Sequence, residues 1–474
     1  NVHKFQFRLQ EKKVEEALLV YISGLEDADS IHENVLDPLK KYADQPGADQ
    51  PVLAELKARI NHSDIQEETD LNRCIEAILG DYRAVLIVNG IQTALLINVP
   101  GAENRGLEEP ATEAAVRGPR IGFIESIYEN MALIRRRIRH PSLRFEFFEL
   151  GRLTKTKVVL GYVSGITQPE MIDQARQRLQ QIHVDSINSS GDVEQYIDDH
   201  PYSIFPTISN TERPDRAAAQ LLEGRFIIFV DGDPIALVAP YIFMESFQSV
   251  EDYSSRPYYA SFVRFLRITA FVLSITFPAL FIAALNFHKE TIPSELIVSM
   301  TATREIVPFP VPMETFIMII LFEVVREAGI RMPRPIGQAV SIVGALILGD
   351  VSVSAGLVGA PTIIVVAFST IASFAITRIA DVMAILRIAL LIPASLLGAY
   401  GLLIALLGLL THMLSLKSFG VPYLAPIAPL HLRDWGDTFI RLPAHWLRNR
   451  PQSIPNLKKE RIKRLPIDHK EDQP

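Results

Sequence analysis

Residues 268–287, ITAFVLSITFPALFIAALNF, decide the fold of this chain because they form an uncharged run of 20 residues. A helix rises about 1.5 Å per residue, so about 20 apolar residues are needed to cross the hydrocarbon core of a bilayer. Pro278 lies inside the run, but neighbouring helices can satisfy the carbonyl group that a proline frees. The run therefore predicts a transmembrane helix.

Two further apolar regions follow, and each carries a few charges. Residues 312–328 contain Glu314 and Glu323, and they fit either a second span with charged ends or a helix lying in the membrane interface. Residues 336–377 have Asp350 as their sole charge, and Gly-Asp and Ala-Pro pairs interrupt them. These interruptions indicate two short helices that face each other, and not one long helix.

The last apolar region is residues 388–416, which contain no Asp, Glu, Lys or Arg and a single histidine, His412. Its 29 residues are too many for one upright helix. Together with residues 382–386, the region fits two short spans bent near Pro393, Gly398 and Gly401.

Small residues surround Asp350 in the apolar region 336–377. Ser352 and Gly356 stand four apart, a spacing that lets helix backbones approach closely in lipid, either within the chain or around a subunit axis. Ionisable groups inside a membrane are costly and are therefore functional candidates, and a ring of carboxylates would attract cations into a pore. The pore or gating candidates are Glu314, Glu323, Asp350, Ser352 and Gly356. The alternatives are that Glu323 pairs with Arg326 or Arg331 and that Asp350 caps a helix.

Basic side chains flank the apolar regions and predict their orientation. Arginines precede the first span and follow the second. Arg378 and Arg387 are interpreted as loop residues after the fourth span. Ten Lys and Arg residues lie between His431 and the last residue of the sequence. Lys and Arg concentrate in cytoplasmic loops. The first residues, NVHKFQFRLQEKK, lack the apolar core of a signal peptide. We expect the N-terminal half and the tail in the cytoplasm, which requires an even number of crossings, four or six.

The first 260 residues are rich in charged side chains and contain two similar segments. Residues 79–99 and 222–239 each hold a β-branched run, an Asn-Gly or Asp-Gly pair and a second apolar run. Such pairs populate the positive φ angles of a type I′ turn, so each segment predicts a β-hairpin. The similarity fits either two related α/β subdomains or two generic hairpins.

The composition divides the chain into five parts. We predict a helical or flexible segment (1–65), two cytoplasmic α/β subdomains (66–150 and 151–255), a transmembrane helical domain (256–416) and an interfacial, basic cytoplasmic tail (417–474). The predicted fold class is an α/β soluble N-terminal region of two subdomains followed by an all-α multi-pass membrane domain.

Sequence signatures of catalysis and cofactor binding are missing. The sequence has no phosphate loop, dinucleotide fingerprint, H-E-x-x-H or G-x-S-x-G motif. Cys74 is its only cysteine, which excludes a disulfide framework and a cysteine-based metal cluster. We expect no enzymatic activity, no cofactor and no metal. The basic run at residues 135–139 ends a predicted helix, where cations complement the dipole, and it favours a solvated helix end or a subunit contact over nucleic-acid binding.

Several phrases of the sequence resemble the GerA family of spore germination proteins. The soluble half contains RGPR (117–120), GFIE (122–125), LIRRRI (133–138), TERPD (211–215) and LLEGR (221–225). The membrane half contains REAGIR (326–331), PRPIGQ (333–338), IASF (371–374) and SFGVPY (418–423). The matching motif residues of the soluble half include Arg117, Arg120, Glu125, Asn130, Arg136, Glu212, Arg213, Pro214 and Asp215. Residues 375–379, AITRI, depart from the Pro-Ser-Tyr-type element that the family has there.

The resemblance implies the A subunit of a nutrient germinant receptor in the inner membrane of a bacterial endospore. Family members act with a B subunit, which is transporter-like and binds the nutrient, and with a lipoprotein C subunit. The A subunit is thought to assemble as a ring, proposed to be a pentamer, that opens an ion channel and releases monovalent cations. We therefore expect B and C subunits, further copies of this chain and membrane lipid as partners, and no nucleic acid.

Three other functions stay open on the sequence. The resemblance also covers a paralogue that is encoded with the dipicolinic-acid channel genes and amplifies germination. A secondary transporter working alone would need inverted repeats, for which the apolar half has too few convincing spans. A scaffold would use the soluble half to dock partners and the spans only as an anchor.

Overall fold

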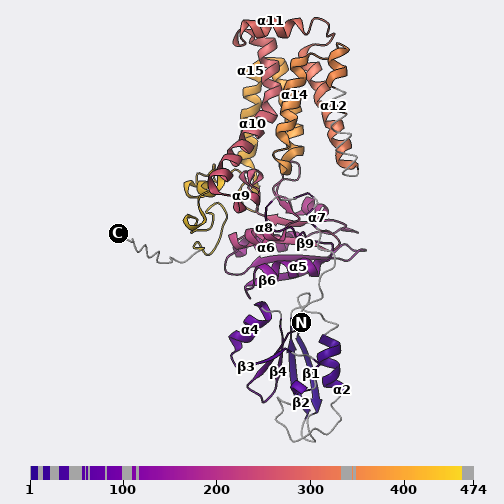
Figure 1. Ribbon diagram of the computed structural model, residues 1–474, viewed down its shortest axis with the longest axis vertical. Coiled ribbons are helices and arrows are strands. Elements are labelled where there is room, and N and C mark those ends of the chain that lie inside the picture. The colour runs from indigo at the N-terminus through magenta and orange to yellow at the C-terminus, as the bar shows by residue number, and fades with distance from the viewer. Residues whose placement is uncertain are drawn as a thin grey trace, which may run out of the picture. The chain divides into compact units, whose positions relative to one another are not determined.

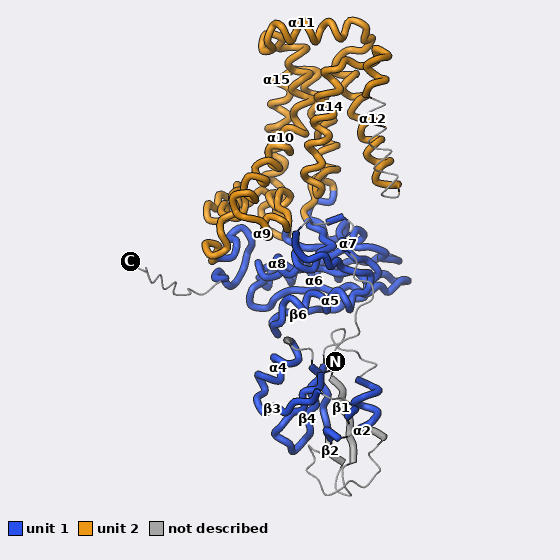
Figure 2. Tube along the Cα trace, in the orientation of Figure 1, with its two compact units in different colours: residues 1–201, 208–240, 449–474 blue, residues 202–207, 241–448 orange. Residues whose placement is uncertain are grey.

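The computed structural model describes residues 2–8, 14–21, 31–41, 56–58, 60–61, 64–80, 83–98, 109–110, 112–113, 117–332, 344 and 349–461. The chain folds into two compact units, which Figure 2 colours separately. The first unit comprises Asn1–Pro201, Ile208–Pro240 and Asn449–Pro474, and the second comprises Tyr202–Thr207 and Tyr241–Arg448. The first unit holds two five-stranded sheets, and the second holds the long helices (Figure 1).

The first α/β subdomain is an antiparallel five-stranded sheet with the strand order β1-β2-β4-β5-β3. Its strands are β1 (Val2–Arg8), β2 (Val14–Val20), β3 (Ile65–Glu68), β4 (Arg83–Val88) and β5 (Ala94–Asn98). Helix α4 (Leu71–Gly80) packs Cys74 and Ala77 onto one face. Leu19 and Leu86 pack on the other face against η1 (His32–Leu36), which α2 (Asp37–Lys41) follows.

Residues 1–65 differ from the predicted helical or flexible segment. β1 and β2 form an antiparallel pair in which Val2 lies opposite Val20, and β2 continues the sheet onto β4, where Val20 lies opposite Val85. The sequence of β2, VEEALLV, does not alternate strictly between apolar and polar residues. Its partner β4 lies far along the chain, so a local pattern could not reveal the pairing.

The second α/β subdomain is also an antiparallel five-stranded sheet, with the order β6-β7-β9-β10-β8. Its strands are β6 (Leu143–Leu150), β7 (Thr156–Val163), β8 (Ser209–Thr211), β9 (Phe226–Val230) and β10 (Ala236–Ala239). Helices α5 (Ile127–Arg137) and α8 (Pro214–Glu223) share one core with Val159 and Phe229. Helices α6 (Pro169–Gln180) and α7 (Ser190–Ile197) complete the subdomain. The predicted boundary at residue 150 falls inside the β6–β7 hairpin, so the subdomain begins earlier than expected.

The two sheets share one topology. Counting strands within each subdomain, both sheets have the order 1-2-4-5-3 and all neighbours are antiparallel. The two hairpins predicted at Asn-Gly and Asp-Gly are β4–β5 and β9–β10, with Gly90 and Gly232 at positive φ. Each hairpin directly follows a helix, α4 or α8. This equivalence favours two related subdomains over two generic hairpins.

The second unit is built from α10 (Pro257–Phe287), α11 (Ser294–Ala302), α12 (Val311–Arg331), α14 (Ala360–Ser373) and α15 (Ala380–Ser415). In the described part of the chain, α10 and the helical stretch 377–415 are long and apolar enough to cross a membrane. Helix α14 is apolar but shorter, and α12 carries charges at both ends.

Helix α15 is two helices that meet at Gly398, whose φ of 62° and ψ of −140° are non-helical. Before this point the chain runs beside α10 in the same direction, since Arg387 contacts Ser274 and Gly398 contacts Phe287. After it the chain returns, because His412 hydrogen-bonds Ser203 and its ring contacts Phe205, which shares a core with Phe271. The predicted bend near Gly398 is confirmed.

Residues 417–474 do not form one tail. The strands β11 (Lys417–Ser418) and β12 (Val421–Pro422) and the residues up to Arg448 belong to the second unit. Residues 449–461 belong to the first unit, where Arg450 Nε donates to the Leu222 carbonyl at 2.6 Å and Asn456 pairs with Thr167. The basic composition did not distinguish these two parts. It suggested solvent-exposed charges, whereas Arg450 binds backbone carbonyls of the folded unit.

Candidate functional site

A buried arginine connects four helices of the second unit. Arg387 lies on α15, and its side chain is fully buried. It donates to the hydroxyl of Ser274 on α10 at 3.1 Å and to the Thr370 hydroxyl and Ser369 carbonyl on α14 at 3.2 and 3.3 Å. Its Nη1 also lies 3.2 Å from Glu323 Oε1 on α12. One guanidinium therefore joins α10, α12 and α14 to α15.

Glu323 extends this contact into a network of four charges. Its Oε2 accepts from Arg326 Nε at 2.7 Å, one helical turn further along α12. Arg326 Nη1 lies 3.5 Å from Asp381 Oδ1, in the first turn of α15. We call Arg387, Glu323, Arg326 and Asp381 the charged network. The alternative that Glu323 pairs with Arg326 is confirmed, and the buried Arg387 is a second partner.

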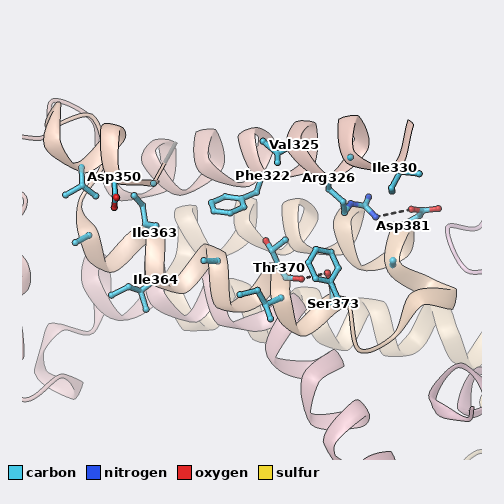
Figure 3. Close-up of a pocket in the computed structure, with 18 of the residues that line it drawn as sticks. Phe322, Val325, Arg326, Ile330, Asp350, Ile363, Ile364, Thr370, Ser373 and Asp381 are labelled. Atoms are coloured by element: carbon cyan, nitrogen blue, oxygen red, sulfur yellow. Dashed lines mark hydrogen bonds and ion pairs between the residues drawn. The ribbon is translucent and has the colours of Figure 1, made fainter. Parts of the chain in front are cut away.

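A pocket of about 1130 Å³ lies next to the charged network (Figure 3). Its walls are mostly apolar side chains of α12 and α14, including Phe322, Ile330, Ile363 and Ile364. Arg326 and Asp381 lie toward one end of this pocket, and Asp350 lies toward the other (Figure 3). The pocket therefore combines apolar walls with charged groups at its ends.

Asp350 lies within the helical residues 349–354 and is exposed. Among the residues that the structure describes, no hydrogen bond or ion pair is found for its carboxylate. It therefore does not act as the helix cap that was its alternative interpretation. Its exposed carboxylate in a region of small residues keeps it a candidate for contact with cations.

Glu314 is fully buried in the first turn of α12, but it has a structural partner on each oxygen. Its Oε1 accepts from the backbone N–H of Gly359, the N-cap of α14, at 2.5 Å. Its Oε2 lies 3.3 Å from Arg304 Nη2. A Cβ at Gly359 would lie 2.9 Å from the Arg304 side chain, so only glycine fits there. The carboxylate complements the N-terminal dipole of α14 and ties α12 to it.

Ser352 and Gly356 do not share a helical face, so the predicted close-packing pair is wrong. Gly356 has a φ of 65°, and its N–H donates to the Val353 carbonyl at 3.0 Å. The Leu357 N–H donates to the Ser352 carbonyl at 3.0 Å. This is the Schellman motif that ends a helix with glycine in the left-handed region. The small residue at 356 is a helix stop, which a spacing rule cannot distinguish from a packing position.

The TERPD motif of the soluble half begins α8. Pro214 is its first residue, and Arg213 binds the carboxylate of Asp215 with two hydrogen bonds of 3.1 and 2.9 Å. Arg213 is buried, and it also donates to the carbonyls of Glu113 and Pro119. This arginine therefore fixes the segment before α5 against the start of α8.

Other motif residues of the soluble half also hold the backbone in place. Buried Asn130 accepts from the Ile124 N–H at 2.9 Å and donates to its carbonyl at 2.5 Å. Glu212 accepts from the hydroxyl of Thr112 at 2.8 Å. Arg117, Arg120 and Glu125 are exposed, Arg136 is half-buried, and the structure does not bring these four into one site.

Comparison with known proteins assigns the family. The family model described as Bacillus/Clostridium GerA spore germination protein matches residues 1–453. The chain belongs to the GerA family. The similar curated relatives include spore germination protein KA of Bacillus subtilis (strain 168), which is 41% identical over 92% of this chain and 80% of the relative.

Two further GerA relatives cover nearly the whole chain. Spore germination protein GerLA of Bacillus cereus is 39% identical over 92% of this chain and 89% of the relative. The membrane protein YfkQ of Bacillus subtilis (strain 168), described as uncharacterized, is 39% identical over 91% of this chain and 84% of the relative. Among solved structures, the N-terminal domain of the A subunit of the Bacillus megaterium spore germinant receptor GerK3 is 34% identical. It covers 51% of this chain and 89% of that domain, with a TM-score of 0.39.

Arg387 and Asp381, two of the four residues in the charged network of this GerA protein, are not among the candidates singled out from its sequence. Arg387 was interpreted as a loop charge used for orientation, but it lies inside α15. The available signal was its isolation, because residues 382–386 before it and 388–416 after it carry no charge. An isolated arginine in an apolar helix must be paired and hydrogen-bonded, which points to a partner such as Glu323.

Proposed function

We propose that this chain is the A subunit of a spore nutrient germinant receptor, which forms part of a cation channel in the inner membrane of the spore. In this proposal several copies assemble around a pore, a pentamer being the expected ring, and monovalent cations pass when germination begins. B and C subunits complete the receptor, and nutrient specificity resides outside this chain. The chain carries out no catalytic step and needs no cofactor or metal. Membership of the GerA family supports the role in germination.

The charged network is the observation that carries the channel proposal. A scaffold that only anchors a soluble domain needs apolar helices and no buried charges. Burying Arg387 with Glu323 costs desolvation free energy, and an anchor would gain nothing from it. Charges inside a membrane bundle mark pathways for ions or the elements that move to open them. Glu323 is shared between Arg326 and Arg387. A shared carboxylate can favour one helix arrangement over another when either pair is weakened.

The fold supports a path through the membrane with the head and the C-terminal segment on one side. Residues 449–461 and the α/β subdomains belong to the same unit, so both must lie on the same side of any bilayer that the helices between them cross. The chain then crosses an even number of times. The reversal of α15 at Gly398 supplies two of these crossings.

Cation conductance by the purified full-length chain tests the proposal. Reconstituted in a planar bilayer with potassium chloride on both sides, the chain is expected to pass current with a preference for potassium over chloride. Asp350→Asn should lower this preference, because it removes the exposed carboxylate of the pocket. Glu170→Gln is the matched control, since Glu170 is an exposed carboxylate of α6 in the soluble unit.

Two outcomes would contradict the proposal in different ways. Absence of conductance from protein that is folded and inserted would favour the scaffold. If Asp350→Asn conducts with the same ion selectivity as the parent, the carboxylate of Asp350 does not line the cation pathway. In spores, Asp350→Asn should alter the release of potassium after a mixture of amino acids and sugars is added, whereas Glu170→Gln should not.

A further inference from the structure

A segment near the end of the second unit exposes large apolar side chains, while its Asp437 and Arg441 are turned toward α10. We call residues 424–448, which include η5 (Leu432–Asp434), α16 (Trp435–Thr438) and η6 (Ala444–Trp446), the collar. Its outward side chains include Leu430, Leu432, Ile440 and Trp446, which are 60%, 66%, 58% and 63% exposed. A surface in contact with water normally shows the opposite arrangement.

The inner side of the collar is fastened to the start of α10 by ion pairs. Arg264 of α10 is fully buried and binds the carbonyl and the carboxylate of Asp437 in α16. The same arginine lies 2.9 Å from Asp252, which also binds Arg267 at 2.9 Å. Arg441 donates its backbone N–H to the Ser261 hydroxyl at 2.9 Å. The collar is therefore held at the level of residues 261–267 of α10.

Residues 261–267 of α10, where the collar is attached, lie at the edge of the hydrocarbon core in the proposed membrane location. The uncharged run of α10 begins at Ile268, so Ser261 and Arg264 precede it by seven and four residues. At about 1.5 Å per residue these positions lie about 6–10 Å outside the core. The polar head-group layer is about 5–8 Å thick on each side of a bilayer. The part of the collar held by Arg264 falls in that layer, and the part held by Ser261 lies just beyond its outer edge.

The apolar surface of the collar continues that of the span itself. The first turns of α10 expose four aromatic side chains, Tyr258, Tyr259, Phe262 and Phe265, of which Tyr258 is 90% and Phe265 66% exposed. Both tryptophans of the chain, Trp435 and Trp446, lie in the collar. Tryptophan and tyrosine concentrate where a membrane meets water, because their rings are apolar and carry one polar group.

The charge of the collar also fits phospholipid. Its arginines are Arg433, Arg441 and Arg448, against two carboxylates, Asp434 and Asp437. Asp437 is engaged by Arg264, whereas Arg433 and Arg448 are exposed. Exposed arginines beside tryptophans suit the phosphate groups of lipids.

We propose that the collar is a membrane-interface element that lies among phospholipid head groups, with Trp435 and Trp446 inserted beside the acyl chains. It anchors the last part of the second unit at the surface that α10 enters. The inference rests on the proposal that the second unit resides in a bilayer. It goes further by assigning residues 424–448, outside the spans, to direct contact with lipid.

Tryptophan fluorescence tests the proposal without added labels, because the chain has only two tryptophans. The full chain is reconstituted in vesicles of phosphatidylcholine and phosphatidylglycerol whose acyl chains carry bromine either near the head group or near the methyl end. The expected result is a loss of emission that is larger for bromine near the head group. Trp435→Phe and Trp446→Phe assign the loss to each ring.

A tryptophan placed in the soluble unit provides the matched control. In Phe147→Trp, combined with Trp435→Phe and Trp446→Phe, the only indole lies on β6 at a position that is 54% exposed. Iodide should quench its emission, and brominated lipid should not.

Each contrary outcome has a separate meaning. Emission of the native tryptophans quenched by iodide alone, in chains that float with the vesicles, would place the collar in water and overturn the inference. Emission that neither quencher lowers would assign the collar to contact with another protein chain, which also overturns it. Chains that do not float with vesicles would refute the membrane location of the second unit.

Discussion

Arg387 shows how one residue can control a helical bundle, because its charge is satisfied by partners on three other helices. Arg387→Met leaves Glu323 paired with Arg326 but takes a donor from the hydroxyls of Ser274 and Thr370. Losing the partner of buried polar groups costs about 1–3 kcal/mol, so the free energy of unfolding in detergent should fall by about this amount. Arg387→Met combined with Glu323→Gln should recover part of the loss, since position 323 then carries no charge for a guanidinium to balance.

An exposed ion pair on α12, the helix that carries Glu323, gives the control for this experiment. Arg331 and Glu327 lie 2.6 Å apart, with side chains 78% and 53% exposed. Arg331→Met should cost about 0.5 kcal/mol or less, because exposed pairs contribute little. A loss in Arg387→Met no larger than that in Arg331→Met, measured by circular dichroism on heating or SDS titration, would show that the charged network does not hold the helices together.

Glu194 of α7 gives the first unit a pH dependence near neutrality. Burial, with a smaller contribution from the charge of Asp198, raises the pKa of Glu194 from 4.5 to about 7. The folded chain thus holds this proton more tightly than the unfolded chain. The resulting stability is fully present below about pH 4.5 and is lost as the pH rises through about 7.

Glu194→Gln should remove this dependence. The variant should be more stable than the parent at pH 8 and about equal to it at pH 5, as measured by the midpoint of thermal unfolding of the full chain. Glu170→Gln, which neutralises an exposed carboxylate of α6, should leave the pH profile of the parent unchanged. A Glu194→Gln profile parallel to that of the parent between pH 5 and 8 would mean that Glu194 keeps an ordinary pKa in the folded chain.

At the scale of elements, the reversal of α15 depends on one glycine. A Cβ at Gly398 would lie 2.8 Å from the ring of Phe287, and its φ of 62° with ψ of −140° is a conformation that other residues rarely adopt. Gly398→Ala should therefore destabilise the second unit by at least about 1–3 kcal/mol. Gly408, in the second part of α15, has nothing within 4 Å of its position for a Cβ. Gly408→Ala should be neutral or stabilising by up to about 1 kcal/mol.

Comparing these two alanine variants in the same detergent isolates the effect of the bend. Both add one methyl group to the same helix, so any difference in their unfolding temperature reports the local backbone and not the added apolar surface. Equal unfolding temperatures would indicate that α15 continues through residue 398 without a sharp turn.

The elements themselves differ in how far the sequence predicts them. The hairpins β4–β5 and β9–β10 were predictable, because Asn-Gly and Asp-Gly determine the turn locally. The bend at Gly398 was predictable from the length of an uncharged run. β1 and β2 were not, because they join the sheet through the pairing of β2 with β4, which lies far along the chain. The contact of Arg387 with Glu323 was missed for the same reason, since these residues lie far apart in the sequence and meet only through the bundle.

At the scale of the whole molecule, the unit that contains both the α/β subdomains and residues 449–461 constrains the path through the membrane. Arg450 donates to the Leu222 carbonyl, Asn456 pairs with Thr167 and Arg461 pairs with Glu223, so the C-terminal segment is built into the first unit. Two points of one folded unit cannot lie on opposite sides of a bilayer. The exposed loop after α10, which includes Glu290, is separated from both by the 31 residues of α10 and should lie on the other side.

Labelling of single cysteines tests this arrangement in intact vesicles. In a Cys74→Ser background, the exposed residues Asp173 and Gln452 and the loop residue Glu290 would each be replaced by cysteine in separate variants. With a maleimide that cannot cross the bilayer, Asp173→Cys and Gln452→Cys should react to the same extent and from the same side. Glu290→Cys should react only when reagent reaches the opposite side. Labelling of Gln452→Cys together with Glu290→Cys, and apart from Asp173→Cys, would require an odd number of crossings and would separate the C-terminal segment from the subdomain that Arg450 contacts.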